Sequence, residues 1–235
     1  MKFRGLSATL VFCLLALSCS GRKESLYEEH LSRLDATLEM ADEYIRAKEQ
    51  KISTIENMLH SRGVTPMQQY HIYGQLYEEY FAFQFDKAKD AIEHQIVLAD
   101  EMGERSLKDD AMLDKALLLT NAGFFLEASQ VFDALDTLAL DKGQMVSWYN
   151  ARQKFLHDYQ EYVRTSEFVV PDADKIKFYQ DKALAGTPST SPMNRHMRIL
   201  RMIEGREFEK AYEENLRFIQ SLDPSEHDYA VQTYW

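Results

Sequence analysis

Residues that commonly carry out enzymatic chemistry are present in this sequence, but none stands in a spacing that catalysis requires. The chain has no His-Glu-x-x-His zinc motif, no Cys-x-x-Cys pair, no Gly-x-Ser-x-Gly elbow and no glycine-rich phosphate loop. Ser225-Glu226-His227-Asp228 brings four polar groups together, but consecutive residues of a helix point in different directions and cannot form a triad. The sequence therefore predicts a protein that is not an enzyme and uses no cofactor or metal.

A second set of candidate residues consists of aromatic side chains at helical spacing. Tyr70, Tyr73, Tyr77 and Tyr80 would share one face of a helix. A tyrosine ring has a flat apolar face and a polar edge, so such a stripe could stack on a sugar or an extended peptide. A glycan-binding platform would use Tyr73, Tyr77, Trp148 and Tyr149. The alternative is that the stripe belongs to the core, with its hydroxyl groups reaching the edge.

Helices must position all of these residues. The sequence has only 9 Gly and 5 Pro, and they are gathered in a few places. Because Gly and Pro mark turns and helix ends, this distribution predicts long helices rather than a turn-rich β protein. Thr65-Pro66 has the cap and first-turn proline of a helix start. Apolar periodicity predicts helices over 25–59, 67–83, 86–102, 144–165, 172–184 and 225–235, and helical hairpins over 111–135 and 194–222. The β-branched run 168–171 is predicted to be an extended connector.

The hairpin at 111–135 contains the most informative motif. Gly123, Phe125, Ala128 and Phe132 stand at the offsets Gly-x-Phe-x-x-Ala-x-x-x-Phe, and the segment resembles a tetratricopeptide repeat. Ala88 and Ala211 occupy corresponding small-residue positions, although Ala88 and Ala128 are 40 residues apart, longer than the usual period of about 34. The resemblance implies an all-α fold, a tetratricopeptide-like α-α superhelix of helical hairpins, over residues 62–235.

This resemblance also implies where a ligand would bind. Repeat scaffolds of this type bind a protein or peptide on the concave face lined by the first helix of each unit. In the central unit the facing positions would be Asp110, Leu113, Asp114, Leu117, Thr120 and Asn121. Packing between helices is the alternative role for the two leucines. Because leucines stand where family members that clamp a terminal carboxylate use Lys and Asn, that mode of binding is not predicted.

Residues 19–61 are expected to form a lipobox region followed by a long amphipathic helix. Steps of four and three from Tyr27 to Leu59 meet apolar residues at every position except Lys48, which is the pattern of a coiled-coil-like helix. Its apolar seam needs a partner. That partner is either the following helices of the same chain or a second copy, which would make a homodimer through residues 27–59.

The amino terminus has the three parts of an export signal. Basic Lys2 and Arg4 precede a short apolar run, and Ala16 and Ser18 suit cleavage after residue 18. Cys19 follows at once and resembles the lipid-attachment cysteine of a bacterial lipoprotein, although Ala16 replaces the preferred Leu. We expect an exported protein of the periplasm or outer membrane, anchored through a lipid on Cys19. The formal net charge of −11 argues against nucleic acid as a partner.

The order of these parts resembles a family of bacterial envelope regulators. A leader, a heptad helix ending near Lys48–Ile52, the run Leu76–Tyr80 and tetratricopeptide-like hairpins are similar to the amino-terminal sensor half of such proteins. The resemblance implies a sensory role and a domain that faces the periplasm. We therefore expect a non-catalytic protein- or peptide-binding scaffold, with a glycan-binding envelope lipoprotein as the alternative.

Overall fold

The computed structural model describes residues 28, 31–32, 35, 38–39, 41–82, 84–163 and 173–222. Within this part of the chain the structure contains helices and no strand, which confirms the predicted all-α class. The helices are α2 (Ala41–Leu59), α3 (Pro66–Tyr80), α4 (Phe85–Met102), α5 (Arg105–Asn121), α6 (Phe125–Ala134), α7 (Lys142–Tyr162), α8 (Ala173–Gly186), α9 (Pro192–Glu204) and α10 (Phe208–Gln220). None of these described helices is long and apolar enough to cross a membrane.

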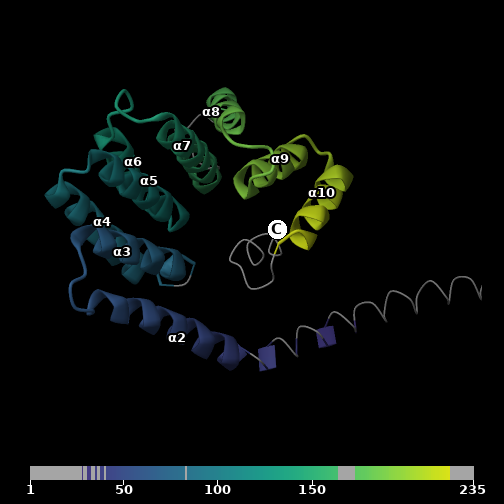
Figure 1. Ribbon diagram of the computed structural model, residues 1–235. Helices are drawn as coiled ribbons and strands as arrows, with labels where there is room; N and C mark the ends of the chain where they lie inside the picture. Colours follow the sequence, from purple (N-terminus) through teal and green to yellow (C-terminus); the bar gives the residue numbers. More distant parts are fainter. Residues whose placement is uncertain are drawn as a thin grey trace, which may run out of the picture. The chain divides into compact units, whose positions relative to one another are not determined.

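The chain divides into two compact units, Met1–Asn57 and Met58–Trp235. In the second unit α3 to α10 form four successive hairpins, and each hairpin packs against the next one in the chain. Figure 1 shows that α3, α5, α7 and α9 lie on the inner side of an arc, whereas α4, α6, α8 and α10 lie on its outer side. The predicted order of nested hairpins is therefore confirmed.

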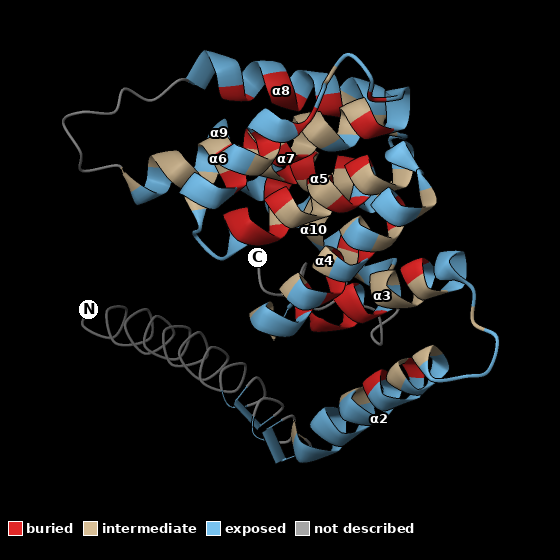
Figure 2. Cartoon of the chain, turned by 90° about the vertical axis from the view of Figure 1, so that its left-hand side faces the viewer, coloured by how far each residue is buried: buried red, intermediate tan, exposed pale blue. Residues whose placement is uncertain are grey.

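The motif around Gly123 makes the turn between α5 and α6. Gly123 has a φ of 79°, a left-handed conformation that glycine adopts without steric cost. Ala128 is completely buried where α6 meets α5 and α7, in one cluster with Ala116, Phe132 and Phe155. A larger side chain at Ala128 would force the helices apart, which explains the alanine physically. Figure 2 shows buried residues, in red, along α5 and α7.

In the last described hairpin a different residue adopts the left-handed conformation of the turn. Gly205 has an ordinary φ of −73°, and Arg206 takes the left-handed position with a φ of 60°. The bonds Arg206 N–H to Ile203 O and Glu207 N–H to Met202 O match those of Gly123 to Thr120 and Phe124 to Leu119. Arg206 is therefore the counterpart of Gly123. Phe208 follows Arg206 by two residues, just as Phe125 follows Gly123.

Polar caps fix the starts of the first helices of three hairpins. The side chain of Thr65 accepts a hydrogen bond from Gln68 N–H, and that of Asp141 accepts one from Gln144 N–H. Ser191 caps α9 in the same way, and Pro192 follows it as Pro66 follows Thr65. These caps satisfy amide groups that the helix leaves free at its first turn.

The amino-terminal seam is only partly covered. In α2 the side chains of Ile52 and Ile55 are buried, whereas Leu31, Leu38 and Ile45 are 57%, 62% and 54% exposed. Whether a second copy covers the seam stays a prediction. The predicted leader, Cys19, the connector 168–171 and the helix 225–235 lie outside the described residues.

Candidate functional site

Two tyrosines of the predicted stripe join α3 to α5. The hydroxyl of Tyr70 donates to the carbonyl of Leu107 at 2.8 Å, and that of Tyr77 donates to the carbonyl of Asp114 at 3.4 Å. Both rings are buried. Burial, reinforced by nearby Asp110 and Asp114, raises the pKa of Tyr70 to about 12, and burial also raises the pKa of Tyr77. Each hydroxyl therefore stays protonated and holds the neighbouring helix by its backbone.

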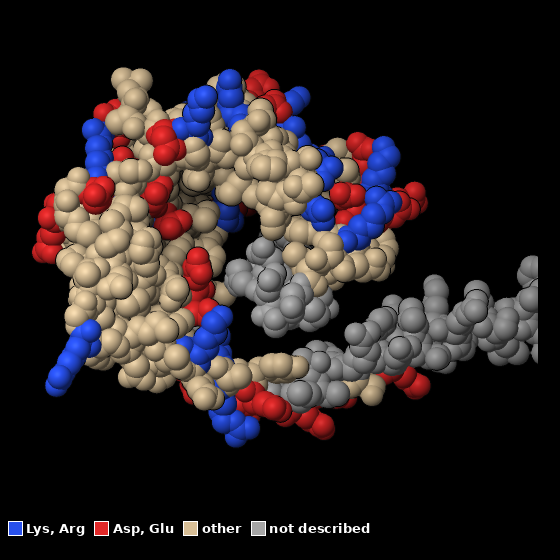
Figure 3. Space-filling view, in the orientation of Figure 1, with Lys and Arg blue, Asp and Glu red and all other residues tan. Residues whose placement is uncertain are grey.

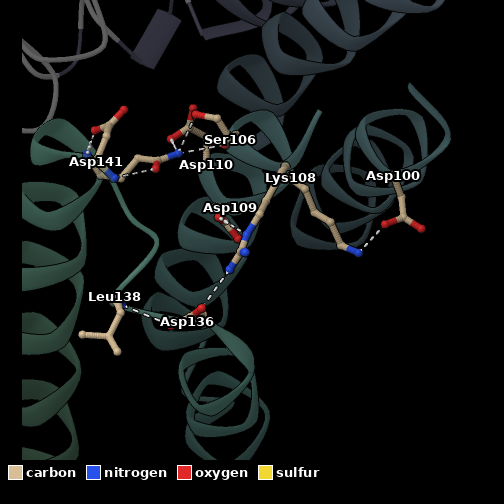
Figure 4. Close-up of polar contacts among 10 residues, drawn as sticks. Asp100, Ser106, Lys108, Asp109, Asp110, Asp136, Leu138 and Asp141 are labelled. Atoms are coloured by element: carbon tan, nitrogen blue, oxygen red, sulfur yellow. Dashed lines mark hydrogen bonds and ion pairs between the residues drawn. The ribbon is translucent and has the colours of Figure 1, made fainter. Parts of the chain in front are cut away.

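Gln144 makes the corresponding connection between α5 and α7. Its side-chain oxygen accepts a hydrogen bond from Asp141 N–H at 3.1 Å, so Gln144 is part of the α7 cap. Its side-chain nitrogen donates to the carbonyl and hydroxyl oxygens of Ser106 at 2.8 and 3.0 Å, and to Oδ1 of Asp110 at 2.9 Å (Figure 4). One buried amide thus fixes both the start of α7 and its position beside α5.

Three carboxyl groups lie near one another on α3 and α5: Glu78, Asp110 and Asp114. Burial, reinforced by the charges of Asp110 and Glu78, raises the pKa of Asp114 from its ordinary value to about 7. Burial likewise raises the pKa of Asp110, with the charges of Asp141 and Asp109 adding to the effect and the bond from Gln144 opposing it. Figure 3 shows acidic side chains, in red, on both the inner and the outer side of the arc, with basic side chains, in blue, among them.

Among the residues described by the structure, no Lys or Arg forms an ion pair with any of these three carboxyl groups. Like charges held together without a counter-ion repel one another. A cation placed between Asp110 and Asp114 would remove that repulsion. The described residues also contain no cluster of His, Cys, Asp or Glu that could hold a metal ion.

The predicted positions on α5 divide into two groups. Asp110 is exposed and Asp114 and Leu117 are partly exposed, and Asn121 is exposed at the end of the helix. Leu113 is buried with Leu135 and Leu140, and Thr120 is 2% exposed and donates its hydroxyl to Ala116 O at 2.8 Å. Leu113 and Thr120 therefore belong to the packing between helices rather than to an accessible face. Asp110 and Asp114 therefore remain as the accessible charged residues that could bind a ligand.

The aromatic residues proposed as a glycan platform are largely taken up by packing. Tyr77 is buried, and Trp148 packs against both core clusters around α5. The ring of Tyr73 stacks on His94 with centroids 4.6 Å apart, and Tyr149 packs beside Tyr179 at 6.1 Å. The four rings consequently do not form one open surface.

Two small hollows elsewhere have their charges paired within the protein. One, of about 350 Å³, lies where α4 and α6 end and α5 begins; there Arg105 pairs with Asp109 and Asp136, and Lys108 pairs with Asp100 (Figure 4). The other, of about 420 Å³, lies between α8 and the last hairpin and includes Arg198 and Arg201. These arginines pair with Glu214 and Asp181. Because these charges are paired within the protein, neither hollow carries an excess of one charge, in contrast to the face of Asp110 and Asp114.

Glu78 and Gln144 are not among the site residues predicted from the sequence. The spacing Asp141-x-x-Gln144 is a capping box, so the sequence did contain a signal for the start of α7. Nothing in the sequence shows that the same amide reaches Ser106 and Asp110, or that Glu78 on α3 lies near Asp114 on α5. Those contacts depend on how the hairpins pack.

Comparison with known proteins agrees with this architecture. Residues 38–235 match the model of the SusR N-terminal TPR domain, whose name includes the tetratricopeptide repeat. The same comparisons find no matching curated protein and no matching solved structure. The match covers most of the chain and confirms the predicted resemblance to tetratricopeptide proteins and to the amino-terminal half of such regulators. Sequence and fold therefore agree that this chain belongs to the SusR N-terminal TPR domain family.

Proposed function

We propose that this domain is a non-catalytic scaffold that binds a protein or peptide on the face formed by the first helices of its hairpins, and that it serves as the sensory part of a regulator. The observation that supports this most is the group of three neighbouring carboxyl groups Glu78, Asp110 and Asp114 on α3 and α5, with which no Lys or Arg of the described residues forms an ion pair. The ligand would present a Lys or Arg side chain to these groups.

The physical reason for expecting a basic ligand is that the charged form of Asp114 is poorly solvated and lies beside other carboxylates. A carboxylate that is partly buried beside two others is poorly solvated, and burial together with these charges raises the pKa of Asp114 to about 7. An ammonium or guanidinium group placed beside Asp110 and Asp114 stabilises both charges at once. Such charge-assisted hydrogen bonds are about twice as strong as neutral ones.

An array of synthetic peptides of equal length, carrying basic, neutral or acidic side chains, tests this proposal. We expect the basic peptides to bind, and their binding to weaken as salt is added because exposed charges are screened. The double variant Asp110→Asn/Asp114→Asn should lose this binding. Glu127→Gln/Asp133→Asn, which also removes two carboxylates but from the exposed surface of α6, is the matched control and should retain it. Equal binding of acidic peptides, or full binding by the double variant, would contradict the proposal.

A glycan is the less suitable ligand. Stacking on a sugar requires an open ring face, whereas Tyr77 is buried and Trp148 fills space between core clusters. We therefore base the proposal on charge rather than on aromatic stacking. An oligosaccharide that bound the wild-type chain and not a Tyr149→Ala variant would reverse this choice.

We further propose that the domain acts in the bacterial cell envelope, exported by residues 1–18 and anchored by a lipid on Cys19. The support is the basic, apolar and small-residue order of the leader, directly followed by the cysteine. Growth with labelled palmitate should label the wild-type protein, and a Cys19→Ala variant should be unlabelled and released from membranes. Unchanged membrane attachment of that variant would refute the lipid anchor.

The exposed heptad positions support a homodimer through residues 27–59. Leu31, Leu38 and Ile45 are spaced by seven residues and are all more than half exposed, and apolar seams of this kind associate in pairs. Sedimentation should show a dimer for the wild-type chain and a monomer for Leu38→Glu. Thr54→Glu introduces the same charge at an exposed position of α2 outside the seam and should leave the dimer intact.

A further inference from the structure

Three aromatic rings hold the side chain of Arg152 on α7. Its guanidinium carbon lies 4.8 Å from the centre of the Phe132 ring, 5.6 Å from that of Phe155 and 5.7 Å from that of Trp148. A cation over an aromatic face is attracted by the electron-rich ring. The rings therefore stabilise the guanidinium group in one place, while the residue as a whole stays partly exposed.

The charge of Arg152 is not balanced within the described part of the chain. No carboxylate of the described residues forms an ion pair with it. Its Nε atom is enclosed and has no hydrogen-bond partner among these residues, although buried donors in proteins nearly always have an acceptor. Its terminal nitrogens are not enclosed in this way, so they are the donors that a ligand can reach.

A second cation lies at the other end of the same aromatic cluster. The ring of Trp148 contacts that of Tyr179 on α8 with centroids 5.5 Å apart, and Tyr179 contacts Phe178 at the same distance. The ammonium nitrogen of Lys182 lies 5.4 Å from the centre of the Phe178 ring. Within the described residues no carboxylate pairs with Lys182. A continuous row of rings thus connects two cations that form no ion pair there.

The α8 end of this row is open to solvent. Phe178 is 50% exposed, and Lys182 is exposed as well. Gln180, which is buried, accepts a hydrogen bond from Arg201 of α9 at 3.4 Å. Phe178 and Lys182 each lie two residues from Gln180, about 200° round the helix. They therefore point away from the last hairpin and are accessible to a partner.

We propose that Arg152 and Lys182 bind two carboxylate groups of an acidic segment of a partner protein. The planar edge of a guanidinium group can donate two parallel hydrogen bonds to one carboxylate, and an ammonium group attracts a second as a point charge. The exposed ring of Phe178 offers an apolar contact next to Lys182. This surface lies on α7 and α8 and selects the charge opposite to that selected by Asp110 and Asp114, so it goes beyond the function proposed above.

The net charge of the chain makes this proposal demanding. A formal charge of −11 repels acidic partners in general. An acidic segment can bind only where particular cations outweigh that repulsion. Removing one of those cations should consequently have a large effect, whereas removing a cation elsewhere should have little.

The fluorescence of Trp148 reports binding at this surface. In a Trp235→Phe background Trp148 is the only tryptophan of the chain, and its ring lies beside Arg152. The probes are two eight-residue peptides of one sequence, in which three Glu of the first are Gln in the second. An extended peptide of this length spans about 26 Å, enough to reach both cations. We expect the Glu peptide to change the emission saturably and the Gln peptide to bind about ten times more weakly.

Arg152→Met separates the charge of this residue from its packing, because methionine keeps a flexible apolar side chain among the rings. This variant should keep the urea midpoint of the wild type and bind the Glu peptide about ten times more weakly. Lys182→Gln should weaken binding about threefold. Lys177→Gln removes the same charge at another exposed position of α8 and should leave binding unchanged. Wild-type binding by Arg152→Met, or equal losses in the two lysine variants, would overturn the proposal.

A last variant separates this surface from the acidic face of α3 and α5. Asp110→Asn/Asp114→Asn should bind the Glu peptide as tightly as the wild type does, whether or not basic peptides bind to the wild-type chain. A loss of Glu-peptide binding in this variant would show that the peptide does not recognise a separate surface of α7 and α8, and would overturn the proposal.

Discussion

Replacing Asp114 by Asn should make the folded domain more stable at neutral and higher pH. Asn keeps the shape of the side chain but has no charge to lose or gain. Burial and the neighbouring carboxylates raise the pKa of Asp114 from 3.8 to about 7. The folded chain therefore holds this proton up to about pH 7, whereas the unfolded chain releases it near pH 4.

The sign and size of the effect follow from this difference. Between about pH 4 and pH 7 the folded state binds more protons at Asp114 than the unfolded state, so its stability falls as pH rises and then levels off. One pKa unit corresponds to about 1.4 kcal/mol, so the loss between pH 5 and pH 8 is on the order of 3 kcal/mol for this group. Asp114→Asn removes the loss.

Urea unfolding, followed by circular dichroism at 222 nm, measures this effect. The difference in unfolding free energy between Asp114→Asn and wild type should grow in favour of the variant from pH 5 to pH 8. Asp133→Asn, which changes an exposed carboxyl group on α6, serves as the control, because it removes the same formal charge and should show no such growth. A pH-independent difference for Asp114→Asn, or the same growth in the control, would refute the account of this site.

Four further changes test the packing. Arg206→Gly should raise the free energy of unfolding by about 1 kcal/mol, since glycine relieves the left-handed backbone at φ 60°; an unchanged urea midpoint would contradict this. Gly123→Ala should lower it by about 1 to 2 kcal/mol through backbone strain alone, because an added Cβ meets no atom within 4 Å. Gln144→Ala should cost about 2 to 3 kcal/mol, because the cap and the bonds to α5 are lost together; a loss below half of that would show that water replaces them. Ala128→Leu should cost about 1 to 3 kcal/mol in the same assay, because that site is fully buried, and a neutral result would mean that the helices separate easily.

Local patterns were enough to predict the helices, because each helix start and stop has its own chemical signal. Thr65-Pro66 and Asp141-x-x-Gln144 begin helices, and Gly123 ends one. The repeat motif then predicted how neighbouring helices pair. Arg206 was not predictable in the same way, because an arginine rarely takes a left-handed conformation and the adjacent Gly205 seemed the natural candidate.

The site was predictable only in part. The repeat resemblance placed Asp110 and Asp114 on a ligand-binding face, and both remain accessible in part. It could not show that Leu113 and Thr120 turn inward, because on a helix enclosed by three neighbours most faces are buried. The influence of Glu78 on Asp114 depends on the distance between two hairpins, which no local pattern determines.

The chain of contacts from α3 through α5 to α7 also has a mechanical consequence. In the described part of the chain each hairpin packs on its neighbouring hairpins, and Tyr70, Tyr77 and Gln144 add side-chain hydrogen bonds between successive first helices. Because each unit of such an array contacts mainly its neighbours, tension along the array separates one pair of hairpins before the next. A pull on one end would therefore alter the spacing between α3 and α5, and with it the affinity for the basic ligand side chain proposed above.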